Sequence, residues 1–180
     1  YQVVGLVETH TNPESNIDLI SQAGAQGFSA SANVAMKYPS SEGNHGGEAV
    51  LASKFTYSIP IDPTVLEFSE NINDDDRRFS AMEIRFGKMS IICIAAYFWC
   101  SEGLSPRNWS ILQQVSQLLW QYKLPFIMYA DFNMAPEAMR ESGWPLQHGG
   151  SLLVPDCTTT CKGSSNILDY CIVSNDIHPF

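Results

Sequence analysis

Basic residues are scarce in this chain of 180 residues. Ten Lys and Arg side chains stand against 19 Asp and Glu, which gives a formal net charge of −9. This balance argues against a protein that binds nucleic acid through a broad basic surface. It leaves room for an enzyme that meets phosphate through a metal ion, because the ion then supplies the positive charge. The most acidic run, 70–78 (ENINDDDRR), is expected to be a solvated loop.

Long apolar runs and a disulfide framework are also missing. No run approaches the roughly 20 apolar residues that a membrane span needs, so no membrane partner is expected. The five cysteines are odd in number, and the pair in CTTTC (157–161) has no second Cys or His pair, which favours loop cysteines over a metal or redox pair. We expect an intracellular, reducing compartment, with the nucleus as one candidate. The chain begins at Tyr1 inside an apolar run and its first Met is Met36, which is typical of a fragment.

Apolar runs alternate with helix-like segments, and this alternation is typical of a layered α/β fold. The strand-like runs are 1–8, 27–36, 48–55, 77–86, 88–98, 124–132 and 166–174. The run 88–98 is almost continuously apolar, which predicts a central strand covered on both faces. Helices are predicted at 15–24, capped by Ser15 or Asn16 and stopped by Gly24, and at 105–123. We expect residues 1–180 to form part of one domain.

Polar residues mark three of the predicted strands. Glu8 closes the first, Asp131 and Asn133 close the run 124–132, and Asp169 lies inside the last. Carboxylates that converge from several strand ends would form an oxygen-rich site suited to Mg²⁺ or Mn²⁺. Asp131 and Asn133 are two apart on an extended segment, so an anion and an amide with two donors would face the same way.

Each acid also has a simpler interpretation. Glu8 is consistent with a solvated strand terminus, and Asp131 with the cap of a short helix beginning near Ala135 or Pro136. Asp169 stands within an apolar run, so its charge needs a partner such as a histidine or a metal. The tryptophans, Trp99 among them, are expected to anchor the core or loops rather than to stack on bases.

Five motifs occur in order: GLVETH (5–10), GGEAVLAS (46–53), IAAYF (94–98), YADFNMAP (129–136) and SSNILDYCIVS (164–174). Together they resemble the endonuclease/exonuclease/phosphatase superfamily. The resemblance implies a deoxyribonuclease I-like fold, a four-layer α/β/β/α sandwich of two packed mixed sheets, here truncated at both ends. With SGW (142–144) and the Thr-Cys stretch before the last motif, the sequence is most similar to endonuclease domains of non-LTR retrotransposons.

The resemblance implies a role for each matching residue. Glu8 would bind the divalent metal, Mg²⁺ or Mn²⁺, and Tyr97 would contact the scissile phosphate. Asp131 would orient or deprotonate the attacking water, Asn133 would hold the phosphate, and Asp169 would orient a catalytic histidine. The implied substrate is nucleic acid, DNA rather than RNA. A fused reverse transcriptase outside this chain is an implied partner.

The chain also departs from the family pattern. The strand with the family's Asn, which precedes the ET motif, is absent. His178 follows Asp169 too closely to lie on a further strand, so the catalytic histidine is expected outside the chain. Ala130 stands where the family usually has Gly. His45, beside two glycines, and Arg78, which would touch a nucleic-acid backbone or pair with the acids before it, are weaker candidates for substrate binding.

Three functions therefore stay open at this point. The first is a metal-dependent phosphodiesterase, a DNA endonuclease of the retroelement type. The second is a catalytically inactive remnant or binding domain with the same fold, since two of the family's motifs are absent. The third is a phosphatase or a phospholipid phosphodiesterase that shares the core residues.

Overall fold

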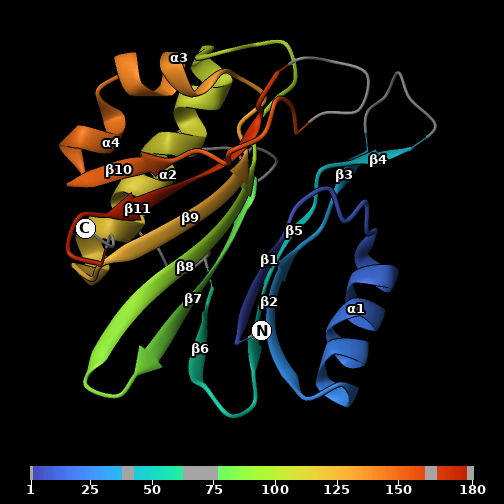
Figure 1. The fold of residues 1–180 in the computed structure, drawn as a ribbon. Helices are drawn as coiled ribbons and strands as arrows, with labels where there is room; N and C mark the ends of the chain where they lie inside the picture. The colour runs from blue at the N-terminus through green and yellow to red at the C-terminus, as the bar shows by residue number, and fades with distance from the viewer. Residues whose placement is uncertain (1, 38–42, 63–76, 161–165, 178–180) are drawn as a thin grey trace.

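The computed structural model describes residues 2–37, 43–62, 77–160 and 166–177. Two β-sheets pack against each other, with helices on their outer faces (Figure 1). The strands are β1 (Val3–Leu6), β2 (Phe28–Asn33), β3 (Met36–Lys37), β4 (Asn44–His45), β5 (Glu48–Ser53), β6 (Tyr57–Ile61), β7 (Phe79–Phe86), β8 (Met89–Tyr97), β9 (Phe126–Asp131), β10 (Gly150–Leu153) and β11 (Asp169–Ser174). The helices are α1 (Pro13–Ala25), α2 (Pro106–Tyr122), α3 (Pro136–Glu141) and α4 (Trp144–Gln147).

The larger sheet has the strand order β10-β11-β9-β8-β7-β6, and the smaller one β1-β5-β2. β8 and β9 pair in parallel, while the other pairs of the larger sheet are antiparallel. The larger sheet is therefore mixed, as the family resemblance implied for both sheets. The strands described in the smaller sheet pair only antiparallel. The short strands β3 and β4 form a separate pair.

Strand β8 is buried on both faces, which confirms the prediction of a central, doubly covered strand. One face packs toward α2 through Ile92, Ile94 and Ala96. The other face packs toward the smaller sheet through Ile91, Cys93 and Ala95. Because neither face meets water, the strand needs no polar alternation, and its sequence reads as one apolar run.

Helix α2 matches the predicted helix within one residue at each end. The Ser105 side chain accepts a hydrogen bond from the backbone N–H of Asn108, and Pro106 stands at the first helical position. The helix ends at Lys123, whose left-handed backbone (φ 52°) directs its N–H to the Leu119 carbonyl. Its buried face joins the core of the larger sheet through Ile111, Leu112, Val115, Leu118 and Leu119.

The predicted caps of the first helix are wrong. Asn12 caps α1 instead of Ser15 or Asn16, because Asn12 Oδ1 accepts from the Ser15 N–H and Ser15 Oγ accepts from the Asn12 N–H, both at 2.8 Å. This reciprocal capping box places the helix start before Ser15. Gly24 does not stop the helix either, since α1 continues to Ala25.

Some elements were not predicted, and some predictions cannot be followed. The strands β3, β4, β6 and β10 and the helix α4 were missed, whereas α3 begins at Pro136, where the sequence predicted a short helix. β6 is an edge strand, and it tolerates Pro60 because no further strand pairs with its outer side. Most of the acidic run 70–78 and Cys161 lie outside the described residues. No helix in the described ranges combines the length and the apolar character that crossing a membrane requires.

A buried polar bridge joins the two sheets at the end of β5. Glu48 is 1% exposed, and its Oε2 accepts a hydrogen bond from Asn33 Nδ2 of β2 at 3.2 Å. The Ser80 hydroxyl of β7 donates to the Glu48 carbonyl at 2.8 Å. Burial raises the pKa of the Glu48 carboxyl to about 8, and the positive charge of Arg78 limits that rise. β2, β5 and β7 are thus tied by one cluster of polar groups.

Replacing Glu48 by Gln should flatten the dependence of stability on pH. Folded Glu48 keeps its proton up to about pH 8, whereas the unfolded chain loses it near the ordinary value of 4.5. Between these values the folded state binds one more proton, so its free energy of unfolding falls as the pH rises. From about pH 5 to pH 8 we expect the wild type to lose on the order of 4 kcal/mol relative to Glu48→Gln in urea denaturation.

Glu83→Gln is the matched control, because it makes the same change at a half-buried position on β7. It should leave the pH dependence of the wild type in place. Parallel stability curves for the wild type and Glu48→Gln would contradict the raised pKa.

Candidate active site

Glu8 lies on a loop that two glycines hold in place. The loop follows β1, and Glu8 (φ 54°) and His10 (φ 53°) both have left-handed backbones. The Thr9 N–H donates to the Gly47 carbonyl at 3.0 Å, and the His10 N–H donates to the Gly46 carbonyl at 2.9 Å. A side chain at Gly47 would collide with Thr9 Oγ1, so glycine is needed for this approach. Left-handed non-glycine residues are costly and gather at functional sites, which makes this loop a candidate.

Tyr97 ends β8 and points its hydroxyl toward the Glu8 carboxylate. Burial raises the pKa of this phenol, and hydrogen bonds to Cys100 and Glu8 raise it further. The hydroxyl lies 3.2 Å from Cys100 Sγ. Tyr97 is therefore protonated across the physiological pH range, and its O–H is a hydrogen-bond donor in the site.

Asp131 ends β9 and lies at the centre of the site. It is the register partner of Tyr97 on β8 and of Asp169 on β11. Burial raises the pKa of its carboxyl from 3.8 to about 6, and the negative charges of Asp169 and Glu8 add to the rise. The Asn133 N–H donates a hydrogen bond to Asp131 Oδ1 at 3.0 Å, which stabilises the charged carboxylate and lowers this pKa. Three carboxylates, from the loop after β1 and from the strands β9 and β11, thus lie close enough to interact.

The structure changes the interpretation of Asn133. β9 ends at Asp131, and Asn133 has a left-handed backbone (φ 49°), so the prediction that both lie on an extended segment is wrong. A tight turn brings them together instead. Asn133 Nδ2 donates to the Phe98 carbonyl at 2.9 Å, and its side chain also hydrogen-bonds the Asp131 carboxylate. The geometry makes Asn133 a group that orients Asp131, and its contact with phosphate stays a prediction.

The helix-cap interpretation of Asp131 is also wrong. The N-cap of α3 is Ala135, which makes no side-chain capping bond. Asp131 is therefore not engaged in ending or starting a helix.

Asp169 is the first residue of β11, whereas the sequence placed it inside the last strand. Its backbone N–H and that of Leu168 both donate to Thr160 Oγ1, at 3.0 and 2.8 Å. The side chain is half-buried rather than enclosed. Its predicted partner, a histidine or a metal, stays a prediction, and His178 lies outside the described residues.

His45 and Arg78 both lie beside Tyr97. They line a pocket of about 270 Å³ together with Tyr97, Trp99, Cys100, Glu102 and Arg107. The guanidinium carbon of Arg78 is 4.6 Å from the centre of the Tyr97 ring, and the residue is 2% exposed. Arg78 thus supports Tyr97 from beneath the surface, while substrate contact by His45 and Arg78 stays a prediction.

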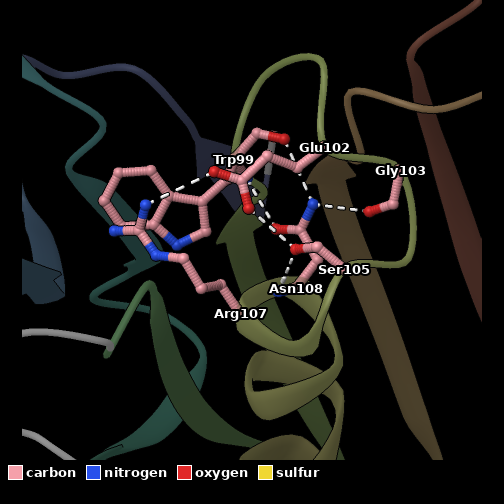
Figure 2. A network of polar contacts seen from close by, with 6 residues as sticks. All are labelled: Trp99, Glu102, Gly103, Ser105, Arg107 and Asn108. Carbon is pink, nitrogen blue, oxygen red and sulfur yellow. Dashed lines mark hydrogen bonds and ion pairs between the residues drawn. The ribbon is translucent and has the colours of Figure 1, made fainter.

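Sequence reasoning missed the clamp that holds the loop after β8. Asn108 is fully buried on α2. Its Oδ1 accepts from the Trp99 N–H at 2.7 Å, and its Nδ2 donates to the carbonyls of Trp99 at 3.1 Å and Gly103 at 2.6 Å (Figure 2). A polar residue in the first turn of an amphipathic helix gives no sign of such a role. Its three bonds fix the backbone next to Tyr97.

The donor set suits a hard divalent cation held by few protein ligands. In the described ranges, no three Asp, Glu, His or Cys side chains are grouped closely enough to form a metal cage. Glu8 and Asp131 nevertheless interact electrostatically across one space, and their oxygens are donors that Mg²⁺ accepts. Mg²⁺ commonly binds through one or two carboxylates and completes its shell with water and substrate phosphate.

No protein-family model matches the sequence, and no curated protein matches it. Solved structures do. One is an endonuclease/exonuclease/phosphatase family protein from Leptotrichia buccalis, with 15% identity over 96% of this chain and 74% of that one, and a TM-score of 0.59. The chain has the deoxyribonuclease I-like fold of this family. This confirms the fold predicted from the five motifs.

Two further matches illustrate the range of proteins with this fold. The endonuclease domain of TRAS1, a telomere-specific non-LTR retrotransposon, has 12% identity over 96% of this chain and 85% of its own, with a TM-score of 0.52. ANGEL2, a 2′,3′-cyclic phosphatase, has 14% identity over 97% of this chain and 70% of its own, with a TM-score of 0.63. At such identities the likeness concerns the fold.

Removing a neighbouring charge should lower the pKa of Asp131. Asp169→Asn deletes one of the negative charges that raise it, so the pKa should move from about 6 toward its ordinary value of 3.8. Carboxyl carbon NMR titration of the metal-free protein measures it directly. Asp156→Asn, on an exposed loop, is the control and should leave the titration in place. A wild-type value near 3.8 would contradict the interaction between these acids.

Proposed function

We propose that this chain is a divalent-metal-dependent phosphodiester hydrolase that cleaves nucleic acid, DNA in particular, as an endonuclease of the retrotransposon type. The observation that carries the proposal is the meeting of Glu8, Tyr97 and Asp131 in one site, from strand ends on two different sheets. The structural likeness to the TRAS1 endonuclease domain supports the substrate class.

Each of these residues has a task in water attack on a phosphodiester. Glu8 would hold the metal ion, which when bound supplies Lewis-acid stabilisation of the phosphate charge and acidifies water. Ionised Asp131 accepts a hydrogen bond from the attacking water, orients it and accepts its proton. Asn133 keeps the Asp131 carboxylate in place through its backbone N–H and side chain. Tyr97 donates its O–H to a phosphate oxygen as negative charge develops there.

Asp169 makes Asp131 a better proton acceptor. Its negative charge stabilises the protonated form of Asp131 and so helps to raise that pKa to about 6. A base with a pKa near the working pH is ionised at neutral pH and still binds a proton well. Asp169 would also orient a catalytic histidine from outside the described residues.

A phosphatase is the second candidate, and one observation favours it. The TM-score with the 2′,3′-cyclic phosphatase ANGEL2 is 0.63, higher than the 0.52 with the TRAS1 endonuclease domain. The same water, acid and tyrosine would serve either reaction, since both attack phosphorus. The two candidates differ in the substrate that fits beside Tyr97.

Nicking of supercoiled plasmid tests the first proposal. We expect cleavage with Mg²⁺ or Mn²⁺ and none with EDTA. Asp131→Ala should lower the rate about 10³-fold and Tyr97→Phe about 10²-fold, the usual cost of losing a base or a charge-stabilising donor. Asp156→Ala is the control and should cut as the wild type does.

The outcomes separate the candidates. Equal nicking by Asp131→Ala and the wild type would refute the role of Asp131. Faster hydrolysis of a nucleoside 2′,3′-cyclic phosphate than of plasmid would favour the phosphatase. DNA binding without hydrolysis of either substrate would favour a non-catalytic domain.

A further inference from the structure

We infer that the pocket beside Tyr97 binds a second phosphate group of the substrate, one that flanks the phosphate being cleaved, and that Arg107 contacts it. The inference rests on the proposed function and narrows it to polynucleotides. A polynucleotide carries a phosphate on either side of each cleavable bond, whereas a lone phosphodiester, such as that of a simple lipid, carries none.

Aromatic rings and guanidinium groups alternate from Tyr97 to the mouth of the pocket. The guanidinium carbon of Arg78 lies 4.6 Å from the centre of the Tyr97 ring and 3.8 Å from the centre of the Trp99 ring. The guanidinium carbon of Arg107 lies 3.4 Å from the centre of the Trp99 ring. Trp99 is only 4% exposed, so it supports the two cations and offers no face to a base. This confirms the expectation that Trp99 is an anchor. The two guanidinium groups therefore place positive charge along a line that starts at the candidate catalytic residue Tyr97.

Arg107 is the member of the row that a ligand can reach. Its side chain is 47% exposed, and its Nη1 pairs with Glu102 Oε1 at 3.3 Å (Figure 2). The other Glu102 oxygen accepts a hydrogen bond from Ser105 Oγ at 2.7 Å. A guanidinium group has five N–H donors in a planar fork, and this ion pair engages one of its nitrogens. The remaining edge can bind a phosphate in the bidentate manner typical of arginine.

The surrounding bonds hold Arg107 ready for such a ligand. Trp99 packs against its guanidinium group, and Glu102 fixes one of its nitrogens. The Asn108 clamp ties the Trp99 backbone to α2, one residue from Arg107 (Figure 2). A side chain ordered before binding loses less conformational entropy when it binds. Arg107, in the first turn of α2, is therefore held against the loop after β8 rather than extended freely into solvent.

The charge of the whole chain makes this pocket the favourable approach for a polyanion. With ten basic against 19 acidic residues, the net charge of −9 repels a phosphate backbone. The pocket places Arg78 and Arg107 next to Tyr97, and Glu102 in the same lining offsets one of these two positive charges. A substrate with flanking phosphates gains attraction here at the place where it must bind to be cleaved.

The salt dependence of DNA binding tests the inference without any cleavage. The probe is a fluorescein-labelled single-stranded 12-mer in EDTA, with Asp131→Asn in every protein, and binding is followed by anisotropy across a range of NaCl concentrations. Arg107→Gln should weaken binding about tenfold at low salt. It should also reduce the slope of log K against log salt by about 0.7, the value for one phosphate contact on a single strand.

Arg85→Gln is the matched control. Arg85 also packs on an aromatic ring, 5.0 Å from the centre of Tyr57, but at the opposite end of β7 from Arg78. It should leave the slope unchanged. An unchanged slope for Arg107→Gln, or an equal reduction for Arg85→Gln, overturns the inference.

A comparison of two substrates separates contact from structural damage. Bis(p-nitrophenyl) phosphate carries a single phosphate, whereas an oligonucleotide carries flanking ones. Arg107→Gln should lower the ratio of kcat/KM for the oligonucleotide to that for the small ester about tenfold, which corresponds to one charged contact. An unchanged ratio overturns the inference. If no protein hydrolyses either ester, the proposed function fails, and the binding experiment alone decides this inference.

Discussion

The parallel pairing of β8 with β9 is the constraint on which the candidate site depends. It aligns Tyr97 with Asp131, and the antiparallel pairing of β11 with β9 aligns Asp169 with the same residue. Three side chains from distant parts of the sequence therefore end in one row across the sheet. A slip of one residue in either pairing would turn a side chain to the opposite face. The buried faces of β8 oppose such a slip, since both carry large apolar groups.

The smaller sheet supplies Glu8, the carboxylate that the row Tyr97, Asp131 and Asp169 on the larger sheet does not include. Glu8 comes from the loop after β1, which hydrogen-bonds to Gly46 and Gly47 just before β5. Glu48 follows directly and, with Asn33 and the charge of Arg78, joins this sheet to the larger one. The same Arg78 packs on Tyr97. Contacts between the sheets, rather than within either, thus determine how near the Glu8 carboxylate lies to the tyrosine hydroxyl.

Local patterns in the sequence were sufficient to predict β8, α2 and the acids at the strand ends, because each depends on periodicity or on a break in an apolar run. The cap at Asn12, the turn at Asn133 and the clamp at Asn108 were missed. Each depends on a hydrogen bond whose partner is chosen by the fold, and asparagine suits caps, turns and buried clamps equally. Arg107 was overlooked for the same reason, since only the folded loop brings Trp99 and Glu102 against it.

The distribution of charge around Tyr97 suits the chemistry of phosphodiesters. On one side, burial raises the pKa of Asp131, and the negative charges of Asp169 and Glu8 raise it further; a divalent cation there would offset those charges. On the other side, Arg78 and Arg107 lie along Trp99. In a phosphodiester chain bound over Tyr97, the reacting phosphate would contact the cation, and the next phosphate along the chain would contact Arg107. An acidic protein can then bind a polyanion at one place while the rest of its surface repels it.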